Sequence, residues 1–237
     1  MLFRSIGADK PAPWLSLAPE ENPALGLRGI RLQLARRDLL ETQLRALLAV
    51  RPSGRLQVML PMIASLAELR EVKALLGQLA NDMGTNQPEL GIMVETPAAA
   101  LVANRLAADA AFFSIGTNDL SQYVLARDRT NPAVANGLDG LDPAVLRLIA
   151  ETVTGANAHG RPTGVCGGLA AVPDAIPILL GLGVTELSVP AAAIPETKAI
   201  VRSLNLARCR ILANEALAAP DADAVRALVR PVLENAA

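Results

Sequence analysis

The chain has 237 residues, of which 51% are hydrophobic and 19% are charged, and its formal net charge is -1. It is too apolar for a disordered protein, and its length suits one large α/β domain with a full core. The scattered lysines and arginines argue against nucleic-acid binding, which needs a concentrated basic face. No window reaches the roughly 18 uninterrupted apolar residues of a membrane span, and no signal peptide is evident. With two cysteines and no disulfide framework, we expect a cytoplasmic single domain over residues 1–237.

Short apolar runs alternate with longer segments of helical period, which is the pattern of a parallel sheet covered by helices. The runs expected to form strands are Leu2–Ile6, Leu56–Leu60, Leu90–Val94, Ala111–Ile115, Pro162–Val165 and Glu186–Val189. The segments expected to form helices are Arg37–Val50, Ser65–Leu79, Pro97–Ala107, Asn118–Ala126, Pro143–Ala158, Pro173–Leu182 and Glu196–Leu204, with two more between Asn205 and Ala237. Further strands near Leu27–Ile30 and Val134–Leu138 would complete a (β/α)8 TIM barrel, the fold that we predict.

Three side chains with useful chemistry follow predicted strands, because Glu95, Asp119 and Cys166 each come within four residues of a strand end. Parallel barrel strands end at one rim, where barrel enzymes keep their active sites. Singly, each residue has an ordinary explanation: acidic residues are favoured at helix N-termini, and cysteine is often a small buried hydrophobe. Together, two carboxylates and the neighbouring amide of Asn118 offer the hard oxygen ligands that Mg²⁺ prefers. We therefore expect a metal site at Glu95 and Asp119.

Two arginines extend this candidate site. Arg28 follows a loop that contains proline and glycine, and Arg129 comes ten residues after Asp119. A guanidinium binds phosphate or carboxylate with paired hydrogen bonds, although each arginine alone is more simply a solvated side chain. His159, the chain's only histidine, precedes Gly160 at a predicted helix end, where a cation meets the helix dipole favourably. We expect His159 to be structural.

Six segments together resemble the C-terminal phosphoenolpyruvate-binding barrel of the PEP-utilising enzymes, and most closely Enzyme I of the bacterial phosphotransferase system. These segments are Ile6–Lys10, Glu21–Arg31, Met59–Ile63, Val94–Ala99, Phe112–Tyr123 and Gly164–Gly167. With weaker similarity between and beyond them, the resemblance extends to about Leu204. The string Gly-Thr-Asn-Asp-Leu at residues 116–120 is fairly specific by itself, and Gln122-Tyr123 with Ala126–Arg129 is closer to Enzyme I than to pyruvate phosphate dikinases or PEP synthases.

The resemblance implies how the candidate residues would act. Glu95 and Asp119 would hold Mg²⁺, Arg28 and Arg129 would clamp the phosphoryl group of phosphoenolpyruvate, and Asn118 would orient the substrate. It also implies a homodimer that serves sugar transport and passes the phosphoryl group to a histidine on a separate domain.

In the same resemblance, Cys166 would exchange a proton with C3 of the enolate to give pyruvate. A thiol with an ordinary pKa of about 8.5 can act as an acid near neutral pH. His159 does not match the acceptor histidine of the family, so we expect a phosphohistidine (HPr-binding) domain to act in trans.

Three positions depart from the family pattern. Leu2 and Ser5 stand where the family has an arginine and an aspartate, and Gly168 replaces a glutamate two residues after the cysteine. These changes leave two alternatives open: a non-catalytic module that senses phosphoenolpyruvate or dimerises, and a Mg²⁺-dependent lyase or aldolase acting on the pyruvate enolate. A cysteine that protonates C3 favours the phosphotransferase, since a lyase does not require it.

Overall fold

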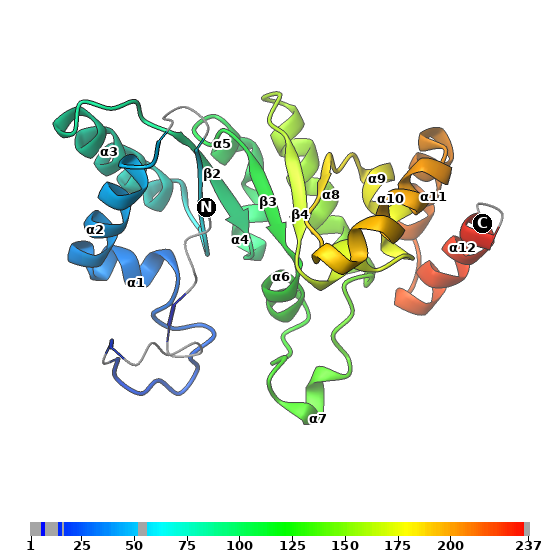
Figure 1. Ribbon diagram of the computed structural model, residues 1–237. Helices are drawn as coiled ribbons and strands as arrows, with labels where there is room; N and C mark the ends of the chain where they lie inside the picture. Colours follow the sequence, from blue (N-terminus) through cyan, green and yellow to red (C-terminus); the bar gives the residue numbers. More distant parts are fainter. Residues whose placement is uncertain (1–5, 8–13, 16, 52–55, 235–237) are drawn as a thin grey trace.

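Five strands form one parallel sheet in the order β1-β2-β3-β4-β5. The computed structural model describes residues 6–7, 14–15, 17–51 and 56–234. The strands are β1 Gln57–Leu60, β2 Glu89–Val94, β3 Phe113–Gly116, β4 Thr163–Cys166 and β5 Glu186–Leu187. Because consecutive strands are parallel, every strand ends at the same edge of the sheet, on the side where helices α6 and α7 lie (Figure 1).

Helices connect the strands and extend the chain at its C-terminal end. They are α1 Ile30–Ala35, α2 Arg37–Leu48, α3 Leu66–Asp82, α4 Pro97–Leu101, α5 Ala103–Ala107, α6 Thr117–Val124, α7 Pro132–Ala135, α8 Pro143–Asn157, α9 Ala175–Leu182, α10 Ile194–Ser203, α11 Leu206–Leu217 and α12 Ala222–Glu234. Two 3₁₀ turns, η1 Gly168–Ala171 and η2 Ala191–Ala193, follow β4 and β5. In Figure 1, α4, α5 and α8 lie behind β2, β3 and β4.

Local sequence signals explain where the long helices begin. Ser65 and Glu68 form a capping box at the start of α3, with Ser65 Oγ accepting from the Glu68 amide and Glu68 Oε2 accepting from the Ser65 amide. Asp142 caps α8 ahead of a proline at its first position. The apolar faces of these helices are fully buried together with the β-branched residues of the strands, for example Leu76, Ile149 and Ile92, and this burial supplies the main driving force for folding.

The predicted α/β class and parallel sheet are confirmed, and five of the expected strands occur within two residues of their predicted bounds. The prediction at Leu2–Ile6 lies almost entirely outside the described residues. Two strand predictions are wrong. Within Leu27–Ile30 the backbone turns at Gly29, whose φ is 55°, and α1 begins at Ile30. At Val134–Leu138, the chain instead ends the short helix α7, which begins at Pro132 after the Asn131 cap.

The described residues form an open sheet rather than a closed cylinder, although its parallel order and helical crossovers are those of a barrel. At the start of the first two strands, Gln57 Nε2 donates to Glu89 Oε2 at 2.7 Å, and both side chains are exposed. Glu186 of β5 is exposed as well. Within the described part of the chain, no helix is both long enough and apolar enough to cross a bilayer.

Candidate functional site

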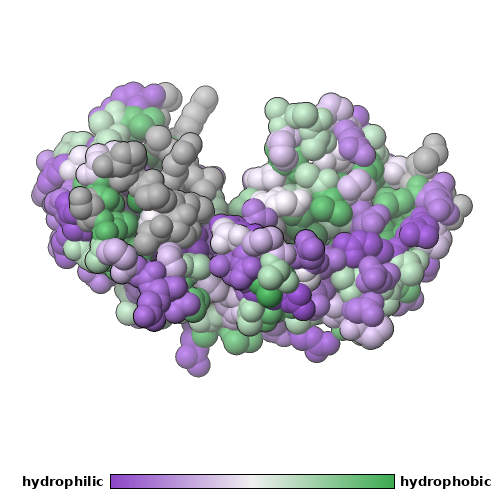
Figure 2. Space-filling model, turned by 90° about the horizontal axis from the view of Figure 1, so that it is seen from below, coloured by the Kyte–Doolittle hydropathy of each residue, from purple (hydrophilic) through white to green (hydrophobic). Residues whose placement is uncertain are grey.

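The C-terminal ends of β2, β3 and β4 bring the predicted residues together. Val94 pairs with Ile115 and Gly116 pairs with Cys166 in the sheet register. Glu95 therefore follows β2 beside the start of α6, which carries Asp119, and Cys166 ends the next strand. This edge faces the viewer in Figure 2, where the outline of the molecule is indented between its two ends.

Glu95 and Asp119 form a buried pair of carboxylates, with only 4% and 5% of each residue exposed. Burial raises the pKa of Glu95 to about 7, and the adjacent charge of Asp119 contributes to the rise. Glu95 Oε2 accepts a hydrogen bond from the backbone N–H of Met62 at 2.8 Å, and this bond lowers the pKa of Glu95. Met62 has a φ of 58°, an unfavourable conformation for a residue with a side chain. The chain therefore accepts local strain in order to direct a backbone donor at this carboxylate.

Arg28 and Arg129 converge on the same oxygen of Asp119. Arg28 Nη1 lies 3.1 Å from Asp119 Oδ1, and Arg129 Nη2 lies 3.4 Å from it. Arg28 is fully buried, whereas the Arg129 side chain is 28% exposed. The two guanidinium groups offset the charge of a carboxylate that burial would otherwise destabilise. They also place two cationic groups with several N–H donors beside the carboxylate pair.

Cys166 lies partly exposed beside the carboxylates. Burial raises the pKa of its thiol, and the charges of Glu95 and Asp119 raise it too, while a hydrogen bond with Ser114 lowers it. The balance keeps the group as a neutral thiol at neutral pH. Cys209, the other cysteine, is fully buried in α11.

Asn118 links α6 to the loop that follows Cys166. Its Oδ1 accepts the backbone N–H of Gly168 at 2.9 Å. Gly167, which lies between Cys166 and Gly168 in the chain, has a φ of 91°. A Cβ atom built on Gly167 would lie 2.7 Å from Thr117 Oγ1. Only glycine fits this close approach without displacing Thr117. Gly168, by contrast, has room for a side chain, since its nearest neighbour would be Asn118 Oδ1 at 3.4 Å.

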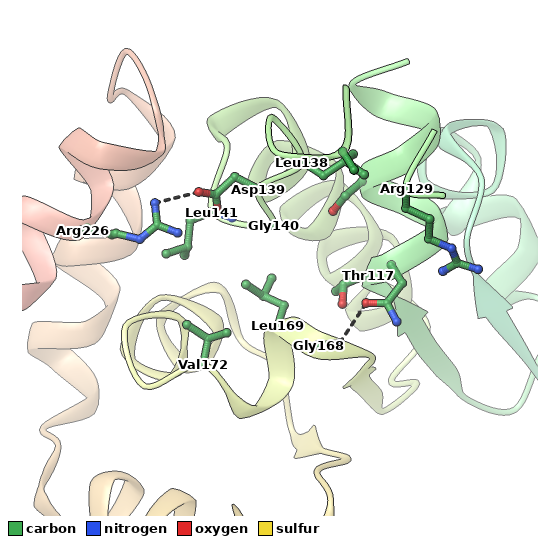
Figure 3. A pocket seen from close by; sticks show the side chains of 13 residues that line it. Thr117, Arg129, Leu138, Asp139, Gly140, Leu141, Gly168, Leu169, Val172 and Arg226 are labelled. Carbon is green, nitrogen blue, oxygen red and sulfur yellow. Dashed lines mark hydrogen bonds and ion pairs between the residues drawn. The ribbon is translucent and has the colours of Figure 1, made fainter. Parts of the chain in front are cut away.

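A pocket of about 470 Å³ opens beside these residues. Thr117 and Arg129 lie at one end, Leu169 and Val172 form a wall, and Arg226 of α12 closes the other end (Figure 3). Asn118 also lines this pocket. The guanidinium of Arg226 lies 2.7 Å from Asp139 Oδ2. Sequence reasoning missed Arg226, because nothing in the local pattern of α12 indicates that it contacts the loop before α8.

Sequence reasoning also missed Gln122 and Tyr123 as parts of the site. Both lie on α6, three and four residues after Asp119, so the three side chains share one face of the helix. Gln122 Oε1 accepts the backbone N–H of Arg129 at 3.0 Å, and Tyr123 Oη accepts from Arg28 Nη1 at 2.8 Å. The helical spacing from a candidate metal ligand was a signal that could have identified them.

Other residues singled out from the sequence lie elsewhere or cannot be placed. His159 is exposed at the end of α8, where its Nε2 lies 2.9 Å from Asn104 Oδ1. Leu2 and Ser5, the positions that depart from the family pattern near the start, lie outside the described residues.

A family model described as "PEP-utilising enzyme, PEP-binding domain" matches residues 3–206. The chain belongs to this family. Every candidate residue from Arg28 to Cys166 lies within the matched range, whereas Arg226 lies beyond it. The family resemblance seen in the sequence motifs is therefore confirmed.

Named relatives share much of the sequence. The chain is 50% identical over 224 residues to a multiphosphoryl transfer protein of Xanthomonas campestris pv. campestris, covering 94% of this chain and 27% of that protein. It is 45% identical to a phosphoenolpyruvate-protein phosphotransferase of Mycoplasma pneumoniae, covering 94% and 39%, and 42% identical to one of Haemophilus influenzae, covering 97% and 41%. The chain thus spans less than half the length of these relatives.

A solved structure supports the fold. The crystal structure of a citrate lyase from Burkholderia xenovorans LB400 aligns with a TM-score of 0.54 and 18% identity, covering 83% of this chain and 68% of that one. At this level of identity the likeness concerns the fold alone.

Proposed function

We propose that the chain binds phosphoenolpyruvate with Mg²⁺ and carries out the phosphoenolpyruvate-to-pyruvate half of a phosphoryl transfer to a protein histidine. The observation that carries this proposal is the convergence of Arg28 and Arg129 on Asp119 Oδ1, beside the buried carboxylate of Glu95. Two carboxylates for a divalent cation and two guanidinium groups for an anion are the groups that a phosphate ester and its metal require.

The donor set suits Mg²⁺. Among the described residues, no group of three or more His, Cys, Asp and Glu side chains could hold a metal ion, so Glu95 and Asp119 would bind as a pair of carboxylates. Mg²⁺ prefers one or two carboxylates and completes its shell with water and substrate oxygens, whereas structural Zn²⁺ sites take four protein ligands. When bound, Mg²⁺ supplies neutralisation of negative charge on the oxygens of the substrate.

Arg28 and Arg129 would hold the phosphoryl oxygens, and Asn118 would orient the substrate. Phosphoryl transfer through a loose transition state depends on positioning and on charge stabilisation more than on covalent help from the protein. The buried Arg28 is well suited to this task, since a guanidinium already freed from water forms stronger hydrogen bonds with an anion.

Cys166 would deliver the proton that converts the enolate into pyruvate. Burial raises the pKa of this thiol, so the proton is still present at neutral pH and available to C3 of the enolate. The P–O bond of phosphoenolpyruvate breaks as the acceptor nitrogen takes the phosphoryl group, and the released enolate then gains this proton at carbon.

The acceptor histidine would be supplied by a phosphohistidine domain in trans, as part of a sugar phosphotransferase system in the cytoplasm, with the chain acting as a homodimer. Support comes from the relatives, which are named phosphoenolpyruvate-protein phosphotransferase and multiphosphoryl transfer protein. We do not assign the acceptor role to His159 of this chain, whose exposed side chain forms a hydrogen bond with Asn104.

Calorimetric titration with phosphoenolpyruvate, with and without Mg²⁺, tests the binding proposal. Glu95→Gln and Asp119→Asn should each abolish the Mg²⁺-dependent part of the affinity. Glu89→Gln is the matched control, because Glu89 is an exposed acid at the start of β2, the strand that Glu95 follows. If phosphoenolpyruvate binds equally with and without Mg²⁺, the metal assignment is wrong.

Deuterium exchange into the methyl group of pyruvate, followed by proton NMR in D₂O with Mg²⁺, tests the chemical step. Cys166→Ser should reduce the exchange at least tenfold, while Cys209→Ser should leave it unchanged. Phosphoenolpyruvate binding without any exchange would favour the sensing module. Exchange that survives Cys166→Ser would favour the lyase or aldolase.

A further inference from the structure

One face of α6 holds both arginines of the candidate site. Asp119 binds the two guanidinium groups directly, and the next turn of the same face adds Gln122 and Tyr123. Gln122 is buried, with 6% exposed, and Tyr123 is partly buried. A buried polar side chain costs free energy unless it is hydrogen-bonded. The hydrogen-bond partners of Gln122 and Tyr123 therefore indicate what these two side chains do at this site.

Gln122 fixes the segment that carries Arg129. Its side-chain Oε1 accepts the N–H of Arg129 at 3.0 Å, and its backbone carbonyl accepts the N–H of Arg127 at 3.1 Å. Between the helix and this segment, Ala126 has a φ of 50°. Such a conformation persists only when its surroundings impose it, and the two hydrogen bonds to Gln122 close the turn. The backbone of Arg129 is therefore set by Gln122 and not by regular secondary structure.

Tyr123 fixes Arg28 in a different way. Its hydroxyl accepts from Arg28 Nη1 at 2.8 Å and donates to the carbonyl oxygen of Ala24. Arg28 Nη1 also lies 3.5 Å from that carbonyl. Arg28 follows a loop of turns and bends over residues 21–27. The Tyr123 hydroxyl therefore joins the guanidinium of Arg28 both to that loop and to α6.

We propose that Gln122 and Tyr123 are positioning residues of an anion clamp, with Gln122 holding Arg129 by its backbone amide and Tyr123 holding Arg28 by its guanidinium. The inference rests on the proposed function, in which these arginines bind the phosphoryl group of phosphoenolpyruvate. Neither residue touches the substrate in this proposal. Each lowers the conformational entropy that its arginine must lose on binding, which is the gain expected from preorganisation.

Comparing the affinities for phosphoenolpyruvate and pyruvate distinguishes a loss of arginine positioning from general damage to the site. Phosphoenolpyruvate carries the phosphoryl group that the clamp binds, and pyruvate does not. Tyr123→Phe, which removes only the hydroxyl, and Gln122→Met, which keeps the length but removes the acceptor, should each weaken phosphoenolpyruvate binding about tenfold. Pyruvate binding with Mg²⁺ should change less than twofold. Equal losses for both ligands, or no loss for either, would overturn the proposal.

Control and rescue variants sharpen this comparison. Thr130→Val removes a hydroxyl in the same loop, one that binds Asp128, and should leave both affinities unchanged. Gln122→Glu restores an acceptor oxygen and should recover most of the affinity lost in Gln122→Met.

Amide hydrogen exchange at Arg129, measured by NMR without ligand, tests the positioning claim separately from the proposed function. Gln122→Met should make this amide exchange at least tenfold faster, whereas Tyr123→Phe should leave it unchanged. If wild type does not bind phosphoenolpyruvate, the proposed function fails, and the exchange rate still decides whether Gln122 fixes Arg129. Unchanged protection in Gln122→Met would overturn that assignment.

Discussion

Arg28 and Asp119 form a buried ion pair across 91 residues of sequence, with 3.1 Å between Nη1 and Oδ1. Transfer of two charges from water into the protein is costly, and their mutual attraction alone rarely gives a large net gain. A neutral pair would fold as well or better. The retention of charge here therefore fits a binding role for the guanidinium better than a purely structural one.

Removal of one partner of this pair should be strongly destabilising. Arg28→Met leaves Asp119 buried with less compensation, so we expect a loss of roughly 3–5 kcal/mol in the free energy of unfolding in urea. Arg37→Met is the control, because Arg37 pairs with Glu41 on an exposed surface, and it should cost less than about 1 kcal/mol. Similar costs for the two variants would contradict the assignment of Arg28 to the buried interior.

The metal-free protein should lose stability as pH rises through the range in which Glu95 ionises. Burial, and then the charge of Asp119, raise the pKa of Glu95 from 4.5 to about 7. The folded state thus binds this proton more tightly than the unfolded state, so the stabilisation is complete below pH 4.5 and is lost as pH rises through about 7. In the presence of a chelator, the free energy of unfolding should fall by on the order of 2–3 kcal/mol across this window.

Glu95→Gln should remove this pH dependence, because the amide has no proton to lose and still offers an oxygen to the Met62 amide. Urea titrations of both proteins at pH 5 and pH 8 make the comparison. Parallel losses of stability in wild type and Glu95→Gln would show that another group is responsible.

Much of the fold and most of the candidate site followed from local sequence. Apolar, β-branched runs such as Leu90–Val94 identify buried strands by composition alone, and parallel topology then places Glu95 and Cys166 at one edge. The two incorrect strands have a different cause. The sequence of Leu27–Ile30 does not reveal that Gly29 adopts a positive φ, and the turn at Gly29 directs the chain into α1.

Side-chain partners were harder to predict than backbone elements. Periodicity places Tyr123 on the same face of a helix as Asp119, but it does not show that Arg28 arrives there from a distant loop. Arg226 is the extreme case, because its partner Asp139 lies far away in the sequence, in the loop between α7 and α8. Such contacts are set by tertiary packing and leave no local signal.

Gly167→Ala should disturb the link between Asn118 and the loop after Cys166. Both a positive φ and a Cβ placed 2.7 Å from Thr117 Oγ1 oppose the substitution, so we expect a stability loss of about 2–3 kcal/mol. Gly160→Ala is the matched control. Gly160 also has a positive φ, of 64°, but a Cβ there meets nothing within 4 Å, and the expected cost is only about 1 kcal/mol.

Thermal unfolding and pyruvate exchange should separate these two glycine variants. Gly160→Ala should keep the exchange activity of wild type, whereas Gly167→Ala should lose most of it as Thr117 and Asn118 shift. If Gly167→Ala matched Gly160→Ala in both measurements, the close packing at Gly167 would be of no consequence.

The ion pair between Arg226 and Asp139 should couple α12 to the wall of the candidate pocket. Both side chains are about one-third exposed, at 33% and 30%, so solvent screening limits their interaction. A double-mutant cycle with Arg226→Met and Asp139→Asn should give a coupling free energy of about 0.5–1 kcal/mol in urea unfolding, and salt at about 1 M should reduce it. Asp139 Oδ1 also accepts a hydrogen bond from the Leu141 amide. Asparagine retains that acceptor, so the cycle measures only the interaction between the charges of Arg226 and Asp139. Additive effects of the two substitutions would mean that α12 is held by its apolar face, through Val225 and Val229, and that the ion pair closes the pocket without stabilising it.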